Sequence, residues 1–337
     1  QPILGFPVPS MFDFKHDKMD TESEAYFADG TFDLSDTTRL SLGLRRTTDE
    51  FTSKQDNFIS ILVPTPVIAA QTCDREVVTE YSSTTSRAVI QHDLSTDSNV
   101  YASFSEGFKA GGYATYECTE PYDPEEVTSF EFGFKGSLSE NTSLNASLFR
   151  YDYTDFQVLQ VVGIQTVTRN AGDATVNGLE LEALSNINDS LIMNYGLTLL
   201  DATYGEFLNT NGIEPQLGEQ QLDGNYLTNA PKVSINLGLN YTSLMSSGAS
   251  LIYRANAAYK SKIYFSEFNE YSQDAYTIVD LNLIWESADE TLRSRFFIKN
   301  ATDEEYISGY LSSATGGGRF GQWGYPRTAG IEIQRNF

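Results

Sequence analysis

The residues with the clearest capacity to bind a ligand lie in one glycine-rich loop near the C-terminus. The run from 311 to 325, LSSATGGGRFGQWGY, combines one arginine with three large aromatic side chains. A guanidinium can pair with negative charge on a ligand, and aromatic rings can stack on a flat group. One interpretation is a ligand-contacting loop built on Arg319, Phe320, Trp323 and Tyr325. The alternative is a flexible loop whose aromatic residues belong to a girdle at a membrane surface.

Residues for catalysis or for metal binding do not form a recognisable group. His16 and His92 are the only histidines. Asp93, next to His92, points to the opposite face of an extended strand, so the two cannot form a local dyad. The acidic run at 123–126 does not match a calcium-binding EF-hand loop. We therefore expect no enzyme, no catalytic residue, no metal site and no cofactor.

The two cysteines, Cys73 and Cys118, have neither a CxxC nor a zinc-ligand spacing. Both fall in connections that we expect on the same side of the protein, on neighbouring hairpins. A disulfide that ties two loops together in an oxidising compartment and a pair of free thiols both remain open.

Composition excludes several classes of protein. Asp and Glu total 46 against 22 Lys and Arg, a net charge of −24, which repels nucleic acid. The mean hydropathy is −0.32, and no stretch approaches the roughly 20 apolar residues of a membrane-spanning helix. Aromatic residues nevertheless make up 13% of the chain. A polar chain rich in Tyr and Phe fits a membrane β-barrel, because only alternate residues of each strand face lipid.

Apolar and polar residues alternate along the chain from about residue 22 to the end. The segment 233–242, VSINLGLNYT, puts Val, Ile, Leu and Tyr on one face of a strand and Ser, Asn, Gly and Thr on the other. The segments 129–135 and 279–286 follow the same rule. The second face is too polar for a packed core, so each strand is expected to separate an apolar side from a wet side.

The alternation predicts about thirteen strands, with boundaries good to about two to four residues. They cover residues 22–34, 38–50, 83–94, 98–111, 127–138, 142–156, 172–185, 191–205, 232–243, 250–264, 276–287, 292–306 and 325–337. Short polar turns alternate with long loops at 51–82, 112–126, 157–171, 206–231, 265–275 and 307–324. This is the asymmetry of a bacterial outer-membrane barrel, which has tight periplasmic turns and long outer loops.

Six segments resemble TonB-dependent receptors, in the order in which that family carries them. They are TESEAYFADGTFDLSDTTRLSLGLRRTTDE at 21–50, YASFSEGFKAGGY at 101–113, PEEVTSFEFGFKGSL at 124–138, RNAGDATVNGLELE at 169–182, IKNATDEEY at 298–306 and GYPRTAGIEIQRNF at 324–337. The resemblance covers nearly the whole chain from about residue 21. The expected fold is therefore an all-β, antiparallel transmembrane β-barrel with meander topology.

The resemblance implies a barrel of 22 strands with a lumenal plug, of which this chain would supply about 13. Single-chain bacterial barrels have even strand numbers, and the chain starts at Gln1 without an export signal. We therefore expect residues 1–337 to be one domain, the C-terminal portion of such a barrel. The plug, its TonB box and the early strands would lie upstream.

The function that the resemblance implies is active import, across the outer membrane of a Gram-negative bacterium, of a ferric siderophore or a similarly scarce nutrient. The implied partners are the TonB–ExbB–ExbD complex acting through the plug, outer-membrane lipid and lipopolysaccharide, and the barrel-assembly machinery. That machinery reads a C-terminal aromatic residue, here Phe337, although Arg335 departs from the usual aromatic pattern. The alternative function is passive diffusion through a porin-type channel.

Overall fold

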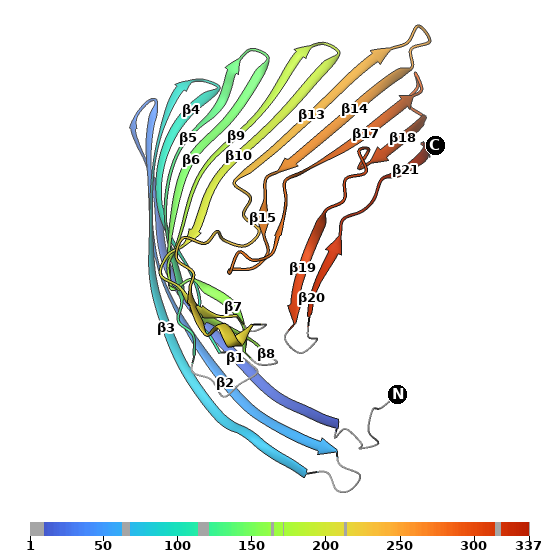
Figure 1. The fold of residues 1–337 in the computed structure, drawn as a ribbon. Coiled ribbons are helices and arrows are strands. Elements are labelled where there is room, and N and C mark those ends of the chain that lie inside the picture. Colours follow the sequence, from blue (N-terminus) through green and yellow to red (C-terminus); the bar gives the residue numbers. More distant parts are fainter. Residues whose placement is uncertain are drawn as a thin grey trace, which may run out of the picture.

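The computed structural model describes residues 10–62, 68–113, 121–162, 165–170, 172–211, 214–313 and 318–336. A single antiparallel sheet of thirteen strands dominates it, as predicted, and the sheet curves strongly (Figure 1). The strands are β1 (Ser10–Ser35), β2 (Thr38–Leu62), β3 (Ile68–Ser95), β4 (Ser98–Lys109), β5 (Glu125–Ser139), β6 (Thr142–Thr154), β9 (Ala174–Asn188), β10 (Leu191–Tyr204), β13 (Val233–Leu244), β14 (Ser250–Lys260), β17 (Tyr276–Glu286), β18 (Leu292–Lys299) and β21 (Thr328–Arg335).

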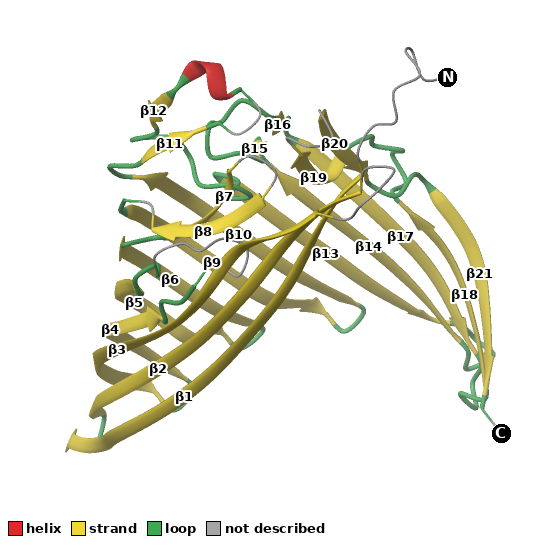
Figure 2. Cartoon of the chain, turned by 90° about the horizontal axis from the view of Figure 1, so that it is seen from below, coloured by secondary structure: helices red, strands yellow, loops and turns green. Residues whose placement is uncertain are grey.

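Each strand of the sheet pairs with the next one along the chain, which confirms the meander topology. Strands β1 and β21 form the two edges of the sheet. Short turns join the strands at one end, and the longer connections gather at the other end, where they fold across the opening (Figure 2). Among the described residues, no helix has the length and apolar character needed to cross a membrane.

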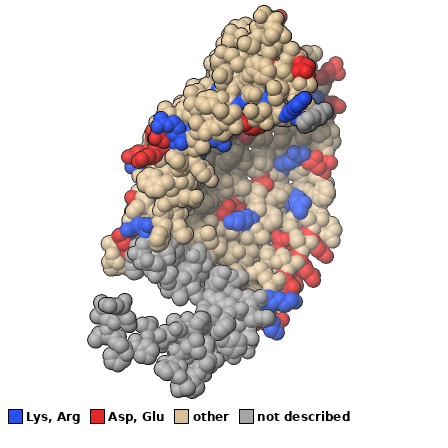
Figure 3. All heavy atoms as spheres, turned by 90° about the vertical axis from the view of Figure 1, so that its right-hand side faces the viewer, with Lys and Arg blue, Asp and Glu red and all other residues tan. Residues whose placement is uncertain are grey.

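The strand register sorts the side chains onto an apolar outer face and a polar inner face. Tyr195, Leu237 and Ala257 lie side by side on the outer face of β10, β13 and β14. On the inner face of the same strands, Gly196 pairs with Asn236. The inner face lines a hollow that carries charges of both signs (Figure 3).

The apolar outer residues are exposed rather than gathered in a dry centre. Phe132, Leu237 and Leu283 keep 58%, 46% and 37% of their surface accessible. An exposed apolar band that continues over adjacent strands is stable only against an apolar medium, because its exposure to water costs free energy. The outer face is therefore built to contact lipid hydrocarbon.

On β6 and β9 the apolar band ends near the long-loop side. On β6, Leu144 and Leu148 give way to Arg150 and Asp152, whose side chains form an ion pair of 2.7 Å. The neighbouring strand β9 changes in the same way, from leucine to Asn177 and beyond. A charged pair on the outer face marks the level at which lipid hydrocarbon ends, because ions are costly inside it.

The long connections are more ordered than the sequence predicted. Residues 51–82, expected to be a loop, mostly extend β2 and β3, which pair as far as Ile61 and Ile68. Outside the membrane neither face of this extension needs to be apolar, so the sequence carries no alternating signal there. Four other connections contain hairpins or strand pairs: β7 (Gln157–Val162) with β8 (Gln165–Asn170), β11 (Leu208–Thr210) with β12 (Glu219–Gln221), β15 (Ile263–Tyr264) with β16 (Ser272–Gln273), and β19 (Ile307–Ser313) with β20 (Gly318–Trp323).

The predicted strand at 292–306 was too long, because β18 ends at Lys299. Asn300 follows with a positive φ of 46°, which breaks the extended backbone. Its side-chain oxygen accepts a hydrogen bond from the Glu304 amide at 2.8 Å, and its side-chain nitrogen donates to the Tyr325 carbonyl at 3.1 Å. Asn300 thus shapes the rim of the sheet where β18 turns towards β19.

Glycines on the inner face make room for aromatic rings on the adjacent strand. The Phe149 ring of β6 lies over Gly178 of β9, where a Cβ atom would collide with it. Gly196 on β10 is also an inner-face strand residue, but the nearest atom to its position for a Cβ is 3.5 Å away, on Asn236. Only the first glycine is required by close packing.

We therefore predict that Gly178→Ala destabilises the sheet by about 1–3 kcal/mol, because Phe149 must leave its rotamer to accommodate the methyl group. The measurement is the free energy of unfolding of the full-length protein by urea titration in lipid vesicles. The matched control, Gly196→Ala, should change it by less than about 0.5 kcal/mol. Equal losses for the two variants would contradict this assignment.

Candidate functional site

The outer end of the protein has a small hydrophobic core of its own, built by loops. Tyr204, at the end of β10, packs with Phe207 and Leu222, and all three are buried. Phe156 reaches this core from the β6–β7 connection and meets Tyr204 edge-on, with ring centroids 6.1 Å apart. The core ties the loops to the inner side of the sheet and gives them a fixed shape.

Asn269 connects two of these loops by side-chain hydrogen bonds. It has a positive φ of 55°, which asparagine tolerates better than most residues. Its Oδ1 accepts from the Tyr226 amide at 2.7 Å, and its Nδ2 donates to the Tyr226 carbonyl at 2.9 Å. Asn225 adds a bond of 2.9 Å to the carbonyl of Glu267. The loops at 205–231 and 261–275 therefore form one unit.

The Glu267 carboxylate is held inside this unit. Its Oε1 accepts a hydrogen bond of 3.0 Å from the side chain of Asn209, which is buried. Burial raises the pKa of Glu267, and the nearby negative charge of Glu270 acts in the same direction. The surroundings of Glu267 therefore penalise its charged form, and the hydrogen bond from Asn209 needs only an acceptor oxygen.

Arg319, predicted as a ligand contact, points into the same region. Its Nη2 donates to Glu214 Oε1 at 2.9 Å and lies 3.9 Å from Glu270 Oε2. Its guanidinium also stacks over the Tyr271 ring, 4.1 Å from the centroid. The charge of Arg319 is therefore already balanced by two carboxylates, and the residue clamps the β19–β20 hairpin onto the neighbouring loops.

A stack of three aromatic rings strengthens this clamp. Tyr310 of β19 lies between Phe265 and Tyr271, with ring centroids 5.7 Å and 5.5 Å away and the rings within 15° of parallel. Offset stacking of this kind adds to the area that the rings bury. With Arg319 at the end of the stack, the hairpin is fixed by both charge and packing.

The other three predicted ligand residues are on the surface. Phe320, Trp323 and Tyr325 keep 55%, 66% and 87% of their surface accessible. Phe320 follows Arg319 directly in β20, so the two side chains point to opposite faces of the hairpin. The structure does not bring the four residues together, and ligand contact by the three aromatic residues stays a prediction.

Several other sequence predictions concern residues outside the described part. Cys118 and Phe337 lie outside it, as does the side chain of Cys73, so the disulfide and the assembly signal stay predictions.

His92 Nδ1 lies 2.9 Å from the Thr38 hydroxyl, whereas Asp93 pairs with Arg39 at 2.7 Å. The two neighbours thus point to opposite faces, as expected. Among the described residues there is no cluster of three or more metal-ligating side chains.

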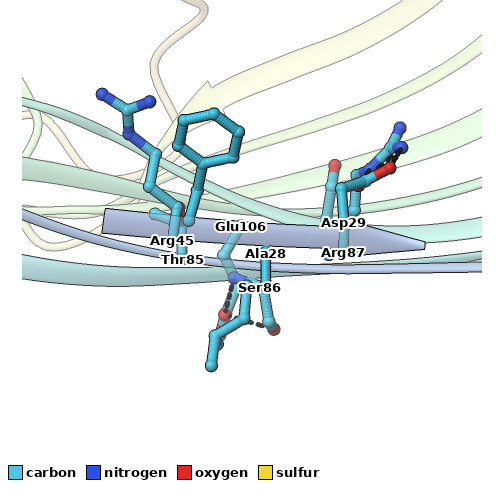
Figure 4. Close-up of a pocket in the computed structure, with 11 residues that line it drawn as sticks. Ala28, Asp29, Arg45, Thr85, Ser86, Arg87 and Glu106 are labelled. Carbon is cyan, nitrogen blue, oxygen red and sulfur yellow. Dashed lines mark hydrogen bonds and ion pairs between the residues drawn. The ribbon is translucent and has the colours of Figure 1, made fainter. Parts of the chain in front are cut away.

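The inner face of the first strands is lined by paired charges. Arg87 of β3 forms an ion pair of 2.9 Å with Asp29 of β1. On the opposite face, Ser86 donates to Glu106 from both its amide, at 3.0 Å, and its hydroxyl, at 2.7 Å. Figure 4 shows the two groups on opposite sides of the sheet. Each face thus satisfies its own polar groups.

A second hollow on the inner face spans β4 to β9. It has a volume of about 280 Å³ and is lined by Tyr101, Glu131, Lys135, Asn145, Ala146, Ser147, Glu180 and Glu182. The Tyr101 hydroxyl donates to Glu131, and the Lys135 ammonium lies over the Tyr101 ring, 5.0 Å from its centroid. The wall is wet, charged and able to contact polar groups in the lumen.

An antiparallel meander with a lipid-facing outer band, a charged inner wall and ordered loops at one end defines the wall of a transmembrane β-barrel. The chain belongs to the family described as TonB dependent receptor-like, beta-barrel, whose model matches residues 3–301. It is accordingly an outer-membrane protein of the Gram-negative type.

Two curated relatives illustrate the family. The ferric-pyoverdine 358 receptor of Pseudomonas putida is 24% identical over 330 residues, which is 93% of this chain and 35% of that protein. The probable TonB-dependent siderophore receptor PiuA of Acinetobacter baumannii is 29% identical over 191 residues, 55% of this chain and 24% of that protein. The chain thus spans about a third of the first relative's length and a quarter of the second's.

Solved structures share the fold. The ferric yersiniabactin uptake receptor FyuA from Yersinia pestis superposes with a TM-score of 0.78 at 19% identity, covering 97% of this chain and 47% of that one. The siderophore receptor PiuA from Acinetobacter baumannii gives a TM-score of 0.72 at 20% identity, covering 94% and 43%. At this level of identity the likeness establishes the architecture of the barrel wall.

We predict that Glu267→Gln stabilises the loop unit at neutral pH. A carboxyl group whose pKa is raised by folding favours the fold below its unfolded pKa, and that contribution is lost as pH rises through the folded value. Glutamine keeps the acceptor for Asn209 without the buried charge. Limited proteolysis of the intact receptor at pH 7.5 should be about threefold slower for the variant, and the gain should vanish near pH 4.5.

The control is Glu219→Gln, an exposed glutamate of the same loop on β12. It removes one negative charge without altering a buried group, and should leave the cleavage rate unchanged at both pH values. If Glu267→Gln speeds cleavage at pH 7.5, the ionised carboxylate stabilises the loops and the assignment is wrong.

Proposed function

We propose that this chain forms part of a TonB-dependent receptor that imports a ferric siderophore across the outer membrane. The observation that carries the proposal is the combination of a lipid-facing outer band with a charged inner wall, in a chain that belongs to the receptor family. The relatives named above are siderophore receptors by name, and the proposal extends that role to this chain.

The proposal treats residues 1–337 as the C-terminal portion of a longer barrel. The sheet is open between β1 and β21, and the chain matches only about a quarter to a half of the proteins that it resembles. A closed wall of 22 strands would complete the hydrogen bonds of both edges. Energy would come from the TonB–ExbB–ExbD complex through a lumenal plug, and the wall would contact lipopolysaccharide and be inserted by the barrel-assembly machinery.

In this proposal the ordered loops meet the ligand first. Phe320 and Trp323 present exposed rings on a hairpin that the Arg319 clamp holds in place. A preordered hairpin costs less conformational entropy on binding than a mobile one. No enzymatic step is part of the proposal.

Passive diffusion is the competing function, and energy dependence separates the two. In a strain that carries the full-length gene as its sole siderophore receptor, uptake of radioactive iron from a panel of ferric siderophores should fall at least tenfold when TonB is deleted. A porin-type channel predicts equal uptake with and without TonB. A strain that lacks the full-length gene but takes up every chelate normally would refute a role in iron import.

A further inference from the structure

The inner face of β14 and β18 carries a stripe of positive charge. Five basic side chains, which we call the basic stripe, lie on it: Arg254 and Lys260 on β14, and Arg293, Arg295 and Lys299 on β18. The inner face of β17 separates the two strands and contributes Asp280, Asn282 and Glu286. Because the whole protein has a net charge of −24, five of its 22 basic residues on one section of wall form an unusual concentration.

Most of these cations have no carboxylate partner in the described part of the protein. Arg295 is the exception, with Glu332 at 3.3 Å and a hydrogen bond of 2.8 Å to Asn282. Arg254, Lys260 and Lys299 are exposed to the hollow. On the opposite part of the wall, by contrast, Arg87 pairs with Asp29 and Arg39 with Asp93. Arg39 and Arg87 of the first strands are thus paired with carboxylates, whereas Arg254, Lys260 and Lys299 have no such partner among the described residues.

An aromatic ring lies within the stripe. Phe297 points to the inner face between Arg295 and Lys299, whose charged groups are 4.9 Å and 6.0 Å from the ring centroid. Its neighbour on β21 is Gly330, where a Cβ atom would collide with the ring. The stripe therefore combines cations with one flat apolar surface, which suits an anion that carries rings or other apolar groups.

The unpaired cations of the basic stripe attract anions in the hollow from beyond contact distance. On this section of the inner face five cations outnumber the three carboxylates of Asp280, Glu286 and Glu332. A wall with an excess of one charge, backed by low-dielectric material, concentrates oppositely charged solutes and speeds their entry. The wall gains most from a ligand with several negative charges.

We propose that the basic stripe on β14 and β18 lines the passage of the transported ligand and selects ferric chelates with a net negative charge. The inference rests on the proposed function, which it narrows from ferric siderophores in general to anionic ones. It assigns the selectivity to the wall of the barrel rather than to the outer loops.

The first test measures the apparent KM of iron uptake by the full-length receptor for ferric chelates of similar size whose net charges run from +1 to −3. The proposal predicts the lowest KM for an anionic chelate, and that this KM rises with NaCl because salt screens the attraction. A preference for a neutral or cationic chelate would overturn the proposal while leaving iron import intact. Failure to take up any chelate would instead refute the proposed function.

The second test removes the charge without changing the strand pattern. The triple variant R254Q/K260Q/K299Q should raise the KM for the preferred anionic chelate about tenfold, and change that for a neutral chelate less than twofold. Arg39→Gln on the inner face of β2, where the charge is already paired with Asp93, is the control and should affect neither. Heat-modifiability of the band on gels confirms that each variant is folded in the outer membrane.

One outcome would assign the stripe to another partner. If it binds an acidic segment of the receptor itself, the triple variant would alter uptake of anionic and neutral chelates by the same factor, and the salt dependence would not change. That result would overturn the proposal, as would a triple variant indistinguishable from the wild type.

Discussion

The structure depends on one constraint, which is that every strand of the sheet must satisfy two different media at once. Residues on the outer face, such as Leu237, meet hydrocarbon, while their neighbours, such as Asn236, meet water. Backbone groups are satisfied by the adjacent strands, so the wall needs no packed core behind it. The apolar band, the charged hollow and the confinement of irregular chain to the two ends all follow from this division.

In the part of the chain that the structure describes, a cluster of buried apolar residues lies where this division ends. Beyond the apolar band, water surrounds the chain, and the loops bury Tyr204, Phe207 and Leu222 among themselves. Asn269 and Arg319 join these loops through hydrogen bonds and an ion pair. The wall is thus stabilised by lipid and strand pairing, and the loops by a compact core of their own. The two parts can vary independently, which suits a scaffold that carries different binding loops.

The sequence predicted the sheet well, because apolar and polar residues alternate wherever one face of a strand meets lipid and the other meets water. All thirteen strands are present, and most boundaries agree within a few residues. The long pairing of β2 and β3 was missed, because residues 51–82 carry no alternating apolar pattern. The Arg319 clamp was also beyond prediction, because Glu214 lies 105 residues away. Side-chain partners in loops depend on how distant segments meet, and no local pattern encodes that.

The most direct measurement of the two-media claim is the accessibility of nitroxide spin labels at adjacent residues. Single cysteines at 236 and 237, with Cys73 and Cys118 replaced by serine, would be labelled in the full-length protein in lipid vesicles. The account predicts that the label at Leu237 collides with oxygen dissolved in lipid, whereas the label at Asn236 collides with a water-soluble nickel chelate. Equal accessibility at both positions, or the reverse order, would contradict it.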